Sequence, residues 1–288
     1  MRGGGRAVSV IIAVTDPLDP RIAPFREVRD RDIVGRRGGF IAEGEVVLNV
    51  LARSRLHRAR ALLISQARIE RLSALIGAFP SDLPVYSAGQ GVMDAIVGFP
   101  IHRGVLAVGR RAAGPSAEAL LASSPPRAVV LALFGVSNHD NMGGIFRNAA
   151  AFGVHGVLLD GACCDPLYRK AIRVSVGAAL TVPFAKLAPG EDAIDLLTRH
   201  GFSALALTPS ATASLAQLAP PKRAAVLLGA EGPGLPAAVL GRARAIAIPM
   251  AGAFDSLNVA TTSGIVLHHL AMARREDAPG GGGSPDRA

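Results

Sequence analysis

Short apolar runs alternate with stretches of helical periodicity along most of the chain. In the C-terminal half these runs lack internal polar positions, as is typical of strands that are buried on both faces of a parallel sheet. The predicted strands are residues 128–134, 157–159, 181–184, 203–207, 224–228 and 245–248. The predicted helices between them are residues 143–152, 167–174, 192–200, 236–240 and 258–273. This order predicts an α/β fold with a mostly parallel sheet and helices on both faces.

A smaller module with the same alternation precedes this region. Its predicted strands are residues 40–42, 61–64, 85–87 and 104–108, and its predicted helices are residues 45–51, 67–76 and 92–97. Strands and helices of this size indicate a small α/β domain over residues 39–111. The chain before it, residues 1–38, is poorly periodic and dense in Asp and Arg, so we expect an arm with a solvated charged face.

Proline, glycine and serine mark the remaining boundaries. Residues 112–127 carry Gly-Pro-Ser early and Ser-Ser-Pro-Pro late, which predicts a linker around a short helix at 118–122. The main α/β domain then spans residues 128–275. Residues 276–288 are rich in glycine and have nothing to bury, so we expect a disordered tail.

Composition excludes several classes of protein. Of the 288 residues, 50% are hydrophobic and only 18% are charged, which excludes a disordered chain. No apolar run approaches the roughly 18 residues that a membrane span needs, and the apolar patch after Arg6 is too short for a signal peptide. We therefore expect a cytoplasmic protein with no membrane segment. Cys163 and Cys164 are adjacent and no zinc-ligand spacing is present, so we expect no metal site.

The charge pattern points to a polyanionic partner. The formal net charge is +9, mostly from arginine, whose planar fork matches phosphate oxygens. Basic residues gather in three turns of the small module, at residues 53–60, 102–103 and 110–111. Contact with RNA or DNA phosphates and simple solvation are equally good explanations of these turns.

Three apolar strands are followed by turns rich in glycine and helix-capping residues. Residues 141–147 read Asn-Met-Gly-Gly-Ile-Phe-Arg, residues 229–235 read Gly-Ala-Glu-Gly-Pro-Gly-Leu, and residues 248–259 end in Asp-Ser-Leu-Asn-Val. Asp, Ser and Asn before an apolar run favour a helix N-terminus, because their side-chain oxygens accept free amide hydrogens. Since ligands bind beyond the carboxyl ends of strands in open α/β sheets, these turns predict the site.

These three segments resemble the three ordered motifs of the SpoU/TrmH family, which belongs to the SPOUT superfamily. Members of the SpoU/TrmH family methylate the ribose 2'-hydroxyl of tRNA or rRNA. The resemblance covers residues 128–273, and extends more loosely to residues 39–111, which resemble the family's small substrate-binding domain. It implies a trefoil knot, a homodimer with the active site at the subunit interface, and S-adenosylmethionine held in the knot. One difference is Asn138-His139, where many members have Asp-Pro.

The glycine turn is the predicted cofactor site. Its glycines allow the backbone to approach a ligand closely and leave amide groups free to bind it, although a lone turn of this kind would equally suit a plain loop. The resemblance implies main-chain contacts to S-adenosylmethionine from Gly229, Ile248 and Leu257. A nicotinamide-dependent dehydrogenase is disfavoured, because no Gly-x-Gly-x-x-Gly opens the first helix.

Arg147 is the leading catalytic candidate. The family assigns the matching arginine as general base for the ribose hydroxyl. Arginine keeps its proton up to about pH 12. Lowering its pKa by about five units, so that it could act as a base, costs about 7 kcal/mol. Binding an RNA phosphate and stabilising the developing alkoxide are therefore physically easier roles. Asn141 is expected to orient the ribose or Arg147, to cap the helix, or both.

Three further residues complete the predicted catalytic set. Glu231 is expected to orient Arg147, to face the positive sulfur of the cofactor or to act as a helix cap. Ser256 and Asn258 are expected to cap the last helix and to contact the substrate or the cofactor. Methyl transfer of this kind needs orientation and charge stabilisation but no metal. Two alternatives stay open, namely methylation of an RNA base by the same fold and a catalytically silent RNA-binding protein. The presence of these residues argues against the silent protein.

Overall fold

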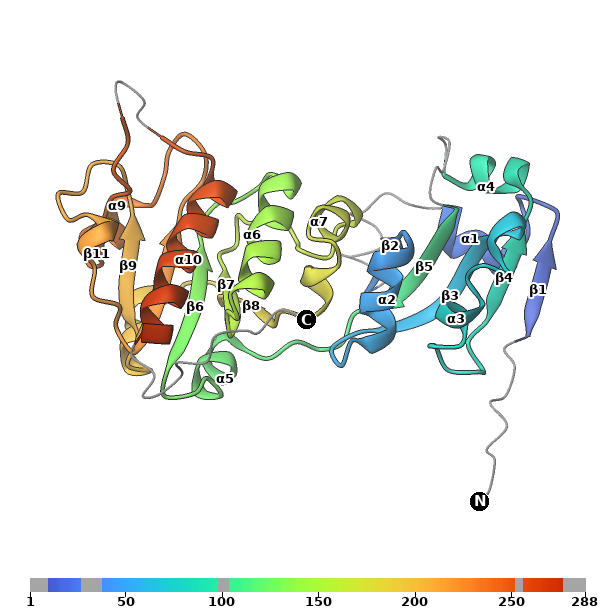
Figure 1. Cartoon of the computed structure of the whole chain (residues 1–288), viewed down its shortest axis with the longest axis horizontal. Coiled ribbons are helices and arrows are strands. Elements are labelled where there is room, and N and C mark those ends of the chain that lie inside the picture. The colour runs from blue at the N-terminus through green and yellow to red at the C-terminus, as the bar shows by residue number, and fades with distance from the viewer. Residues whose placement is uncertain (1–9, 27–37, 98–103, 252–255, 277–288) are drawn as a thin grey trace, which may run out of the picture. The chain divides into compact units, whose positions relative to one another are not determined.

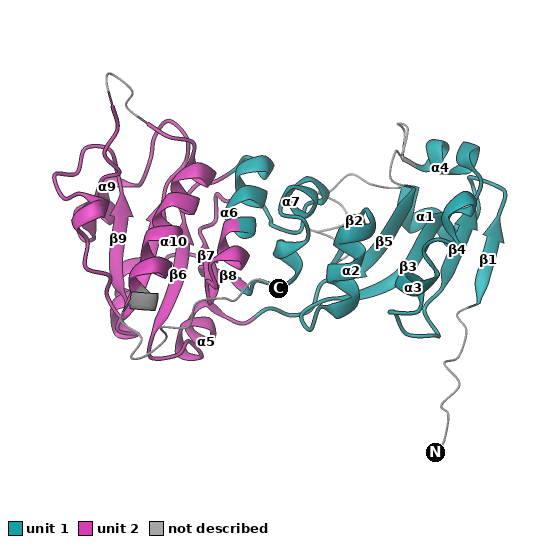
Figure 2. Ribbon diagram, in the orientation of Figure 1, with its two compact units in different colours: residues 1–114, 137–147, 164–183 teal, residues 115–136, 148–163, 184–288 magenta. Residues whose placement is uncertain are grey.

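The computed structural model describes residues 10–26, 38–97, 104–251 and 256–276. The chain divides into two compact units, shown in Figure 2. Unit 1 holds residues 1–114, 137–147 and 164–183, and unit 2 holds residues 115–136, 148–163 and 184–288. Two segments of the predicted domain 128–275 therefore group with the small N-terminal module. The turn at 102–103, Asp255 and the tail after Ala278 lie outside the described residues.

Unit 1 is built on a mixed five-stranded sheet in the order β1-β4-β3-β5-β2. Its strands are β1 (Ile11–Val14), β2 (Gly39–Glu43), β3 (Arg58–Ser65), β4 (Val85–Ala88) and β5 (Val105–Arg110). Strands β1, β4 and β3 run parallel, whereas β5 runs antiparallel to both β3 and β2. The predicted small α/β module is thus present, with its strands slightly longer than the apolar runs.

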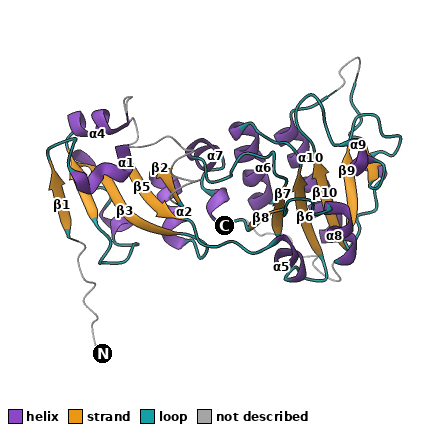
Figure 3. Cartoon of the chain, turned by 180° about the vertical axis from the view of Figure 1, so that it is seen from behind, coloured by secondary structure: helices purple, strands orange, loops and turns teal. Residues whose placement is uncertain are grey.

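Short helices cover both faces of this sheet. They are η1 (Pro20–Ile22), α1 (Ala23–Arg26), α2 (Glu45–Arg53), η3 (Gln66–Arg68), α3 (Ser73–Ile76), α4 (Gln90–Val97), α7 (Arg169–Val174) and η4 (Ala178–Leu180). Helices α2 and α3 lie in front of the sheet in Figure 1, and α1 and α4 lie in front of it in Figure 3. The single helix predicted at 67–76 is replaced by η3 and α3, separated by turns.

The N-terminal arm differs from its predicted form. Strand β1 pairs with β4, and Ile22 and Phe25 are fully buried in the core of unit 1. Within the described residues of the arm, the expected solvated face is seen at Arg21, which is exposed and pairs with Asp19. The apolar positions at 11–14, 22 and 25 were too few to stand out from the surrounding charges.

Buried ion pairs attach residues 164–183 to the small sheet. The Arg169 guanidinium donates to Glu43 Oε2 on β2 at 2.8 and 3.1 Å, and both side chains are largely buried. Arg111, which follows β5, forms a second pair with Asp165 at 2.5 Å. Removing one member of such a pair leaves an uncompensated buried charge, so these contacts fix the segment in place.

His57 makes unit 1 sensitive to acid. Burial, together with the positive charge of Arg111, lowers the pKa of His57 from 6.5 to about 4, while Asp165 opposes this shift. The folded chain therefore holds His57 neutral, whereas the unfolded chain binds a proton below about pH 6.5. The stabilising contribution of neutral His57 is fully present above pH 6.5, and it is lost as the pH falls toward 4. We expect acidification from pH 7 to pH 5 to lower the free energy of unfolding by about 2 kcal/mol through this residue.

Urea unfolding of the native chain and the His57→Gln variant at both pH values measures this contribution. Glutamine keeps a polar side chain but does not titrate. The free energy of unfolding of the variant should therefore fall by about 2 kcal/mol less on acidification than that of the native chain. The same pH dependence in both proteins would show that His57 is not the responsible group.

Unit 2 contains a six-stranded sheet in the order β11-β9-β10-β6-β7-β8, with every neighbouring pair parallel. Its strands are β6 (Ala128–Leu133), β7 (Gly156–Leu159), β8 (Phe184–Lys186), β9 (Ser203–Leu207), β10 (Arg223–Leu228) and β11 (Arg244–Ile246). The strand predicted at 181–184 begins only at Phe184, because Pro183 has no backbone donor for the ladder. The predicted parallel sheet is otherwise present.

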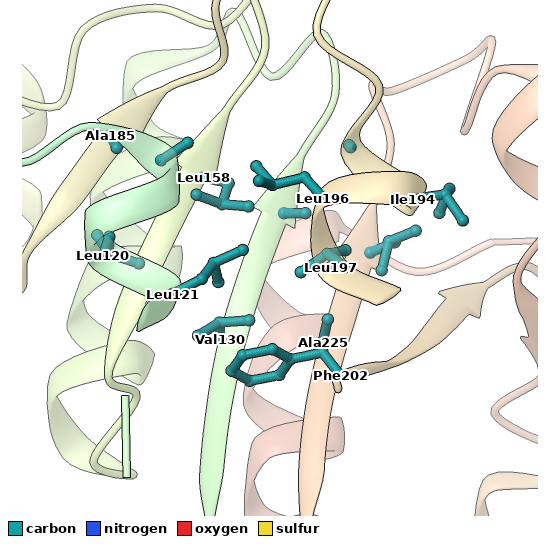
Figure 4. Packing of buried hydrophobic residues seen from close by; sticks show 14 of the residues in the cluster. Leu120, Leu121, Val130, Leu158, Ala185, Ile194, Leu196, Leu197, Phe202 and Ala225 are labelled. Atoms are coloured by element: carbon teal, nitrogen blue, oxygen red, sulfur yellow. The ribbon is translucent and has the colours of Figure 1, made fainter. Parts of the chain in front are cut away.

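Helices pack on both faces of this sheet. Helices α5 (Ala117–Ala122), α8 (Ala193–Arg199) and α9 (Ala237–Leu240) contribute to one core cluster with alternate residues of the strands, and Figure 4 shows its centre. Helix α10 (Val259–Glu276) covers the other face, and α6 (His139–Ala151) passes from unit 1 into unit 2 after Arg147. The predicted linker at 112–127 is partly wrong, because Leu120 and Leu121 on α5 are buried in this core. Among the helices of the described residues, none combines the length and the hydropathy of a membrane span.

Candidate active site

The loop after β10 is a closed backbone turn that only glycine permits. The Gly234 amide donates to the Ala230 carbonyl at 3.0 Å, so the chain folds back on itself. A Cβ added to Gly229 would lie 2.1 Å from the carbonyl carbon of Gly234. Gly232 and Gly234 have φ values of 86° and 71°, in the left-handed region that favours glycine. The glycines of this motif therefore have a backbone reason, independent of any ligand.

Asn258 connects this loop to the last helix. Its Oδ1 accepts from the amides of Ala260 and Thr261 at 2.9 and 3.2 Å, so it caps α10 as predicted. Its Nδ2 donates to Glu231 Oε1 at 3.3 Å. One side chain thus orders the helix N-terminus and holds the carboxylate of the glycine loop.

A cavity of about 680 Å³ lies at the carboxyl ends of three neighbouring strands of unit 2, namely β9, β10 and β11. Its wall includes the glycine loop, residues that follow β9 and β11, and the first turn of α10. The lining residues are Leu207, Thr208, Pro209, Leu228, Gly229, Ala230, Glu231, Gly232, Gly234, Ile246, Ile248, Met250, Ser256, Leu257, Asn258, Val259 and Thr262. This volume is typical of a pocket for a cofactor-sized ligand.

Six of the eight predicted site residues line this one cavity. They are Gly229, Glu231, Ile248, Ser256, Leu257 and Asn258. Asn141 and Arg147 lie instead on the part of α6 that belongs to unit 1, and they are not among the described lining residues. The lining residues Leu207, Thr208 and Pro209 were not predicted as site residues. Their strand was predicted, but its place between β10 and β11 is set by long-range pairing, which no local pattern reveals.

The first motif differs in detail from its predicted form. Helix α6 begins at His139, four residues before the predicted start, and Asn138 Oδ1 accepts from the amides of Asp140 and Asn141 at 2.8 and 3.3 Å. The expected capping role of Asn141 is therefore wrong, because Asn138 is the cap. Asn141 is buried in the first turn, with 6% of its surface exposed.

Gly143 serves packing rather than a tight helix start. A Cβ there would lie 2.7 Å from Val174 Cβ and 2.9 Å from the Ala171 carbonyl oxygen, both on α7. Arg147 follows one turn later with an exposed side chain, and within the described part of the chain it forms no ion pair. Its guanidinium is thus accessible to a substrate.

Asn148, the residue after Arg147, fixes α6 against α10. Its Nδ2 donates to the Ala260 carbonyl at 2.8 Å and to Ser263 Oγ at 2.9 Å. A Cβ on Gly264 would lie 3.2 Å from the same nitrogen, so glycine gives the amide room to reach the helix. This contact was not predictable from the sequence, because an asparagine within a helix gives no local signal of its partner.

Asn258 allows capping and ligand contact to be separated. We expect Asn258→Ala to lower the free energy of unfolding by about 1 kcal/mol through loss of the cap. Asn258→Asp retains the capping oxygen but loses the Nδ2 hydrogen bond that holds Glu231 and repels this carboxylate from its position, so we expect near-native stability and weaker cofactor binding. Urea unfolding and calorimetric titration with S-adenosylmethionine measure the two effects. Equal destabilisation by both variants would contradict the capping role.

Comparison with known proteins identifies the family. Residues 128–268 match the model of the SpoU rRNA Methylase family. An uncharacterised tRNA/rRNA methyltransferase of Mycobacterium bovis is 39% identical over 280 residues, covering 93% of this chain and 94% of that protein. The chain belongs to the SpoU rRNA methylase family. The family predicted from the three motifs is thereby confirmed, and membership makes the chain an RNA methyltransferase.

Solved structures of rRNA methyltransferases share the fold over almost the whole chain. An rRNA methyltransferase from Sinorhizobium meliloti is 26% identical with a TM-score of 0.73, covering 93% of this chain and 99% of that one. The AdoMet-bound S. meliloti structure is 24% identical with the same TM-score, covering 95% and 100%. These similarities confirm the predicted α/β fold, and the bound AdoMet agrees with the cofactor predicted for this family.

Proposed function

We propose that this chain is an S-adenosylmethionine-dependent methyltransferase that modifies the ribose 2'-hydroxyl of tRNA or rRNA in the cytoplasm. The observation that carries the proposal is the single cavity in which Gly229, Ile248 and Leu257 meet at the carboxyl edge of the sheet. These three residues come from two separate motifs of the sequence. Their convergence is what a cofactor site in this family requires.

The cavity fits the cofactor in its chemistry as well as its size. Leu228, Ile246 and Val259 offer apolar walls for a purine ring, and the glycine loop offers backbone groups that no Cβ obstructs. Glu231, held by Asn258, places negative charge at the cavity wall. When bound, S-adenosylmethionine supplies a methyl group on a positively charged sulfur. A carboxylate near that charge favours binding of the donor over the neutral product.

On the substrate side we assign Arg147 and Asn141 to the RNA. Arg147 is exposed, and its planar guanidinium can bind a phosphate and stabilise negative charge on the ribose oxygen while keeping its own proton. Asn141 is assigned to positioning within the first turn of α6. The family resemblance implies that these groups act at a site completed by a second copy, so the proposal includes a homodimer. Light scattering of the purified protein tests this assembly.

Methyl transfer from labelled S-adenosylmethionine into total tRNA and rRNA tests the activity. The RNA is taken from a strain that lacks the gene, digested and mapped by nucleoside. We expect 2'-O-methylated nucleosides, which protect the adjoining phosphodiester from alkaline cleavage. A base-methylated nucleoside would replace the ribose proposal with its alternative. RNA binding without methyl incorporation would instead indicate a catalytically silent protein.

A further inference from the structure

Three exposed cations of unit 1 lie against carboxylates. Arg71 pairs with Glu45 at 2.9 Å, Arg21 pairs with Asp19 at 2.5 Å and Lys170 pairs with Asp140 at 2.6 Å. In unit 2, Arg242 is held between Asp192 and Asp195. Such pairs balance surface charge locally and leave little net field for a polyanion.

Five arginines around β3 and the end of β5 lack such a partner in the part of the chain that the structure describes, and we call these five the arginine cluster. All five are exposed, and within the described residues none of them forms an ion pair. They are Arg53, Arg55, Arg58, Arg60 and Arg110. The neighbouring acid, Asp165, is already paired with Arg111 at 2.5 Å. The cluster therefore carries uncompensated positive charge.

The fold brings the cluster together from two segments. Arg58 and Arg110 are direct partners in the antiparallel ladder of β3 and β5, where opposite side chains lie on the same face. The turn before β3 lies beside the end of β5, because the Ala112 amide donates to His57 Nδ1 at 3.4 Å. Arg55 belongs to this same turn, and Arg53 is the last residue of α2 directly before it.

Ser54 holds the turn in one conformation. Its Oγ accepts from the amides of Leu56 and His57, each at 3.2 Å, and donates to the Leu180 carbonyl at 2.7 Å. The arginines on either side of Ser54 are thus presented from an ordered backbone. An ordered turn reduces the entropy lost when several arginines bind one extended ligand.

The arrangement is unfavourable for the isolated protein. Like charges directly opposite each other destabilise an antiparallel pair, and three more arginines within a few residues add to the repulsion. A ligand with regularly spaced negative charges removes this repulsion, and the RNA backbone is such a ligand.

We propose that the arginine cluster is a docking surface for the RNA phosphate backbone, separate from the cofactor cavity. This inference rests on the proposed function, because it takes the RNA substrate as the ligand. The surface would bind sequence-independently and raise the affinity for RNA without taking part in methyl transfer. Contact through five arginines makes binding strongly dependent on salt concentration.

The double variant Arg58→Gln, Arg110→Gln tests the proposal in the full-length chain. We expect RNA affinity at 100 mM salt to fall about tenfold or more, and the slope of log affinity against log salt to become shallower by about 1.5 to 2. The Michaelis constant for RNA should rise while kcat at saturating RNA and affinity for S-adenosylmethionine stay unchanged. The melting temperature should be equal or higher, because the repulsion is relieved.

The matched control is Arg21→Gln, Arg71→Gln, which removes the same charge from exposed, paired positions of unit 1. It should change RNA affinity less than twofold. Equal RNA affinities and salt slopes in the two double variants would overturn the docking surface. So would an unchanged RNA affinity accompanied by lost affinity for an acidic peptide, which would assign the cluster to a protein partner. Absence of methyl transfer by the native chain would instead count against the proposed function and leave the binding comparison valid.

Discussion

Arg147→Ala is expected to abolish methyl transfer to RNA while leaving binding of S-adenosylmethionine intact. Removing a group that stabilises developing charge typically lowers the rate by about 10² to 10³. Arg147 is exposed and forms no ion pair among the described residues, so its loss should change the free energy of unfolding by less than about 0.5 kcal/mol. Single-turnover methyl transfer, calorimetric cofactor binding and urea unfolding measure the three quantities.

A lysine at position 147 distinguishes the two roles that an arginine can have. If Arg147 stabilises charge, Arg147→Lys retains the charge but loses the planar fork, so its rate should lie between those of the native and alanine proteins. If Arg147 acts as a base, lysine should be the better residue, because it loses its proton more easily. A lysine variant faster than the native chain would contradict the electrostatic role. Native turnover in Arg147→Ala would contradict any catalytic role.

Gly229→Ala is expected to eliminate cofactor binding. The added Cβ would lie 2.1 Å from Gly234 C and 2.3 Å from Leu235 N, and these are backbone atoms that no side-chain rotation can move. The loop must therefore open, which disrupts the wall formed by Gly229, Glu231 and Gly234. We expect affinity for S-adenosylmethionine to fall by at least about 100-fold, since the backbone contacts of the site are lost together. Calorimetric titration measures this loss.

Gly241→Ala is the matched control in the same unit. Its added Cβ would meet the Ala237 carbonyl oxygen at 3.5 Å, an ordinary contact, and its φ of −67° suits alanine. This variant should bind S-adenosylmethionine as the native chain does. Native-like affinity in Gly229→Ala would mean that the cavity between β9, β10 and β11 is not the cofactor site.

The sequence predicted the elements of unit 2 well, because each of its strands is a continuous apolar run bounded by turns. Strand β9 has the predicted limits, and β10 begins one residue early. Unit 1 was harder to predict. Between residues 66 and 76, apolar positions three and four apart suit two short turns of helix as well as one long helix, and the structure contains the two short ones. Periodicity alone does not decide between them.

The site was predictable as far as local motifs reach. Residues 229–235 and 248–259 carry their own signal in glycines and capping side chains, and their members line one cavity. The contribution of Thr208 and Pro209 depends on β9 lying beside β10, a long-range pairing. The grouping of residues 164–183 with the small module depends on Arg169 reaching Glu43 across 126 positions of sequence. A pattern within a short stretch of sequence predicts neither of these long-range contacts.

The buried pair of Glu43 and Arg169 limits how this protein can be recombined with its relatives. Glu43 lies in the small module, whereas Arg169 lies within the residues that match the SpoU model. A chimera that exchanges residues 39–111 alone keeps Arg169 but replaces Glu43, so a donor module without a carboxylate at this position leaves the buried guanidinium unpaired. Grafting a new substrate specificity onto this chain therefore requires a donor module that supplies this carboxylate, or exchange of residues 164–183 together with the module.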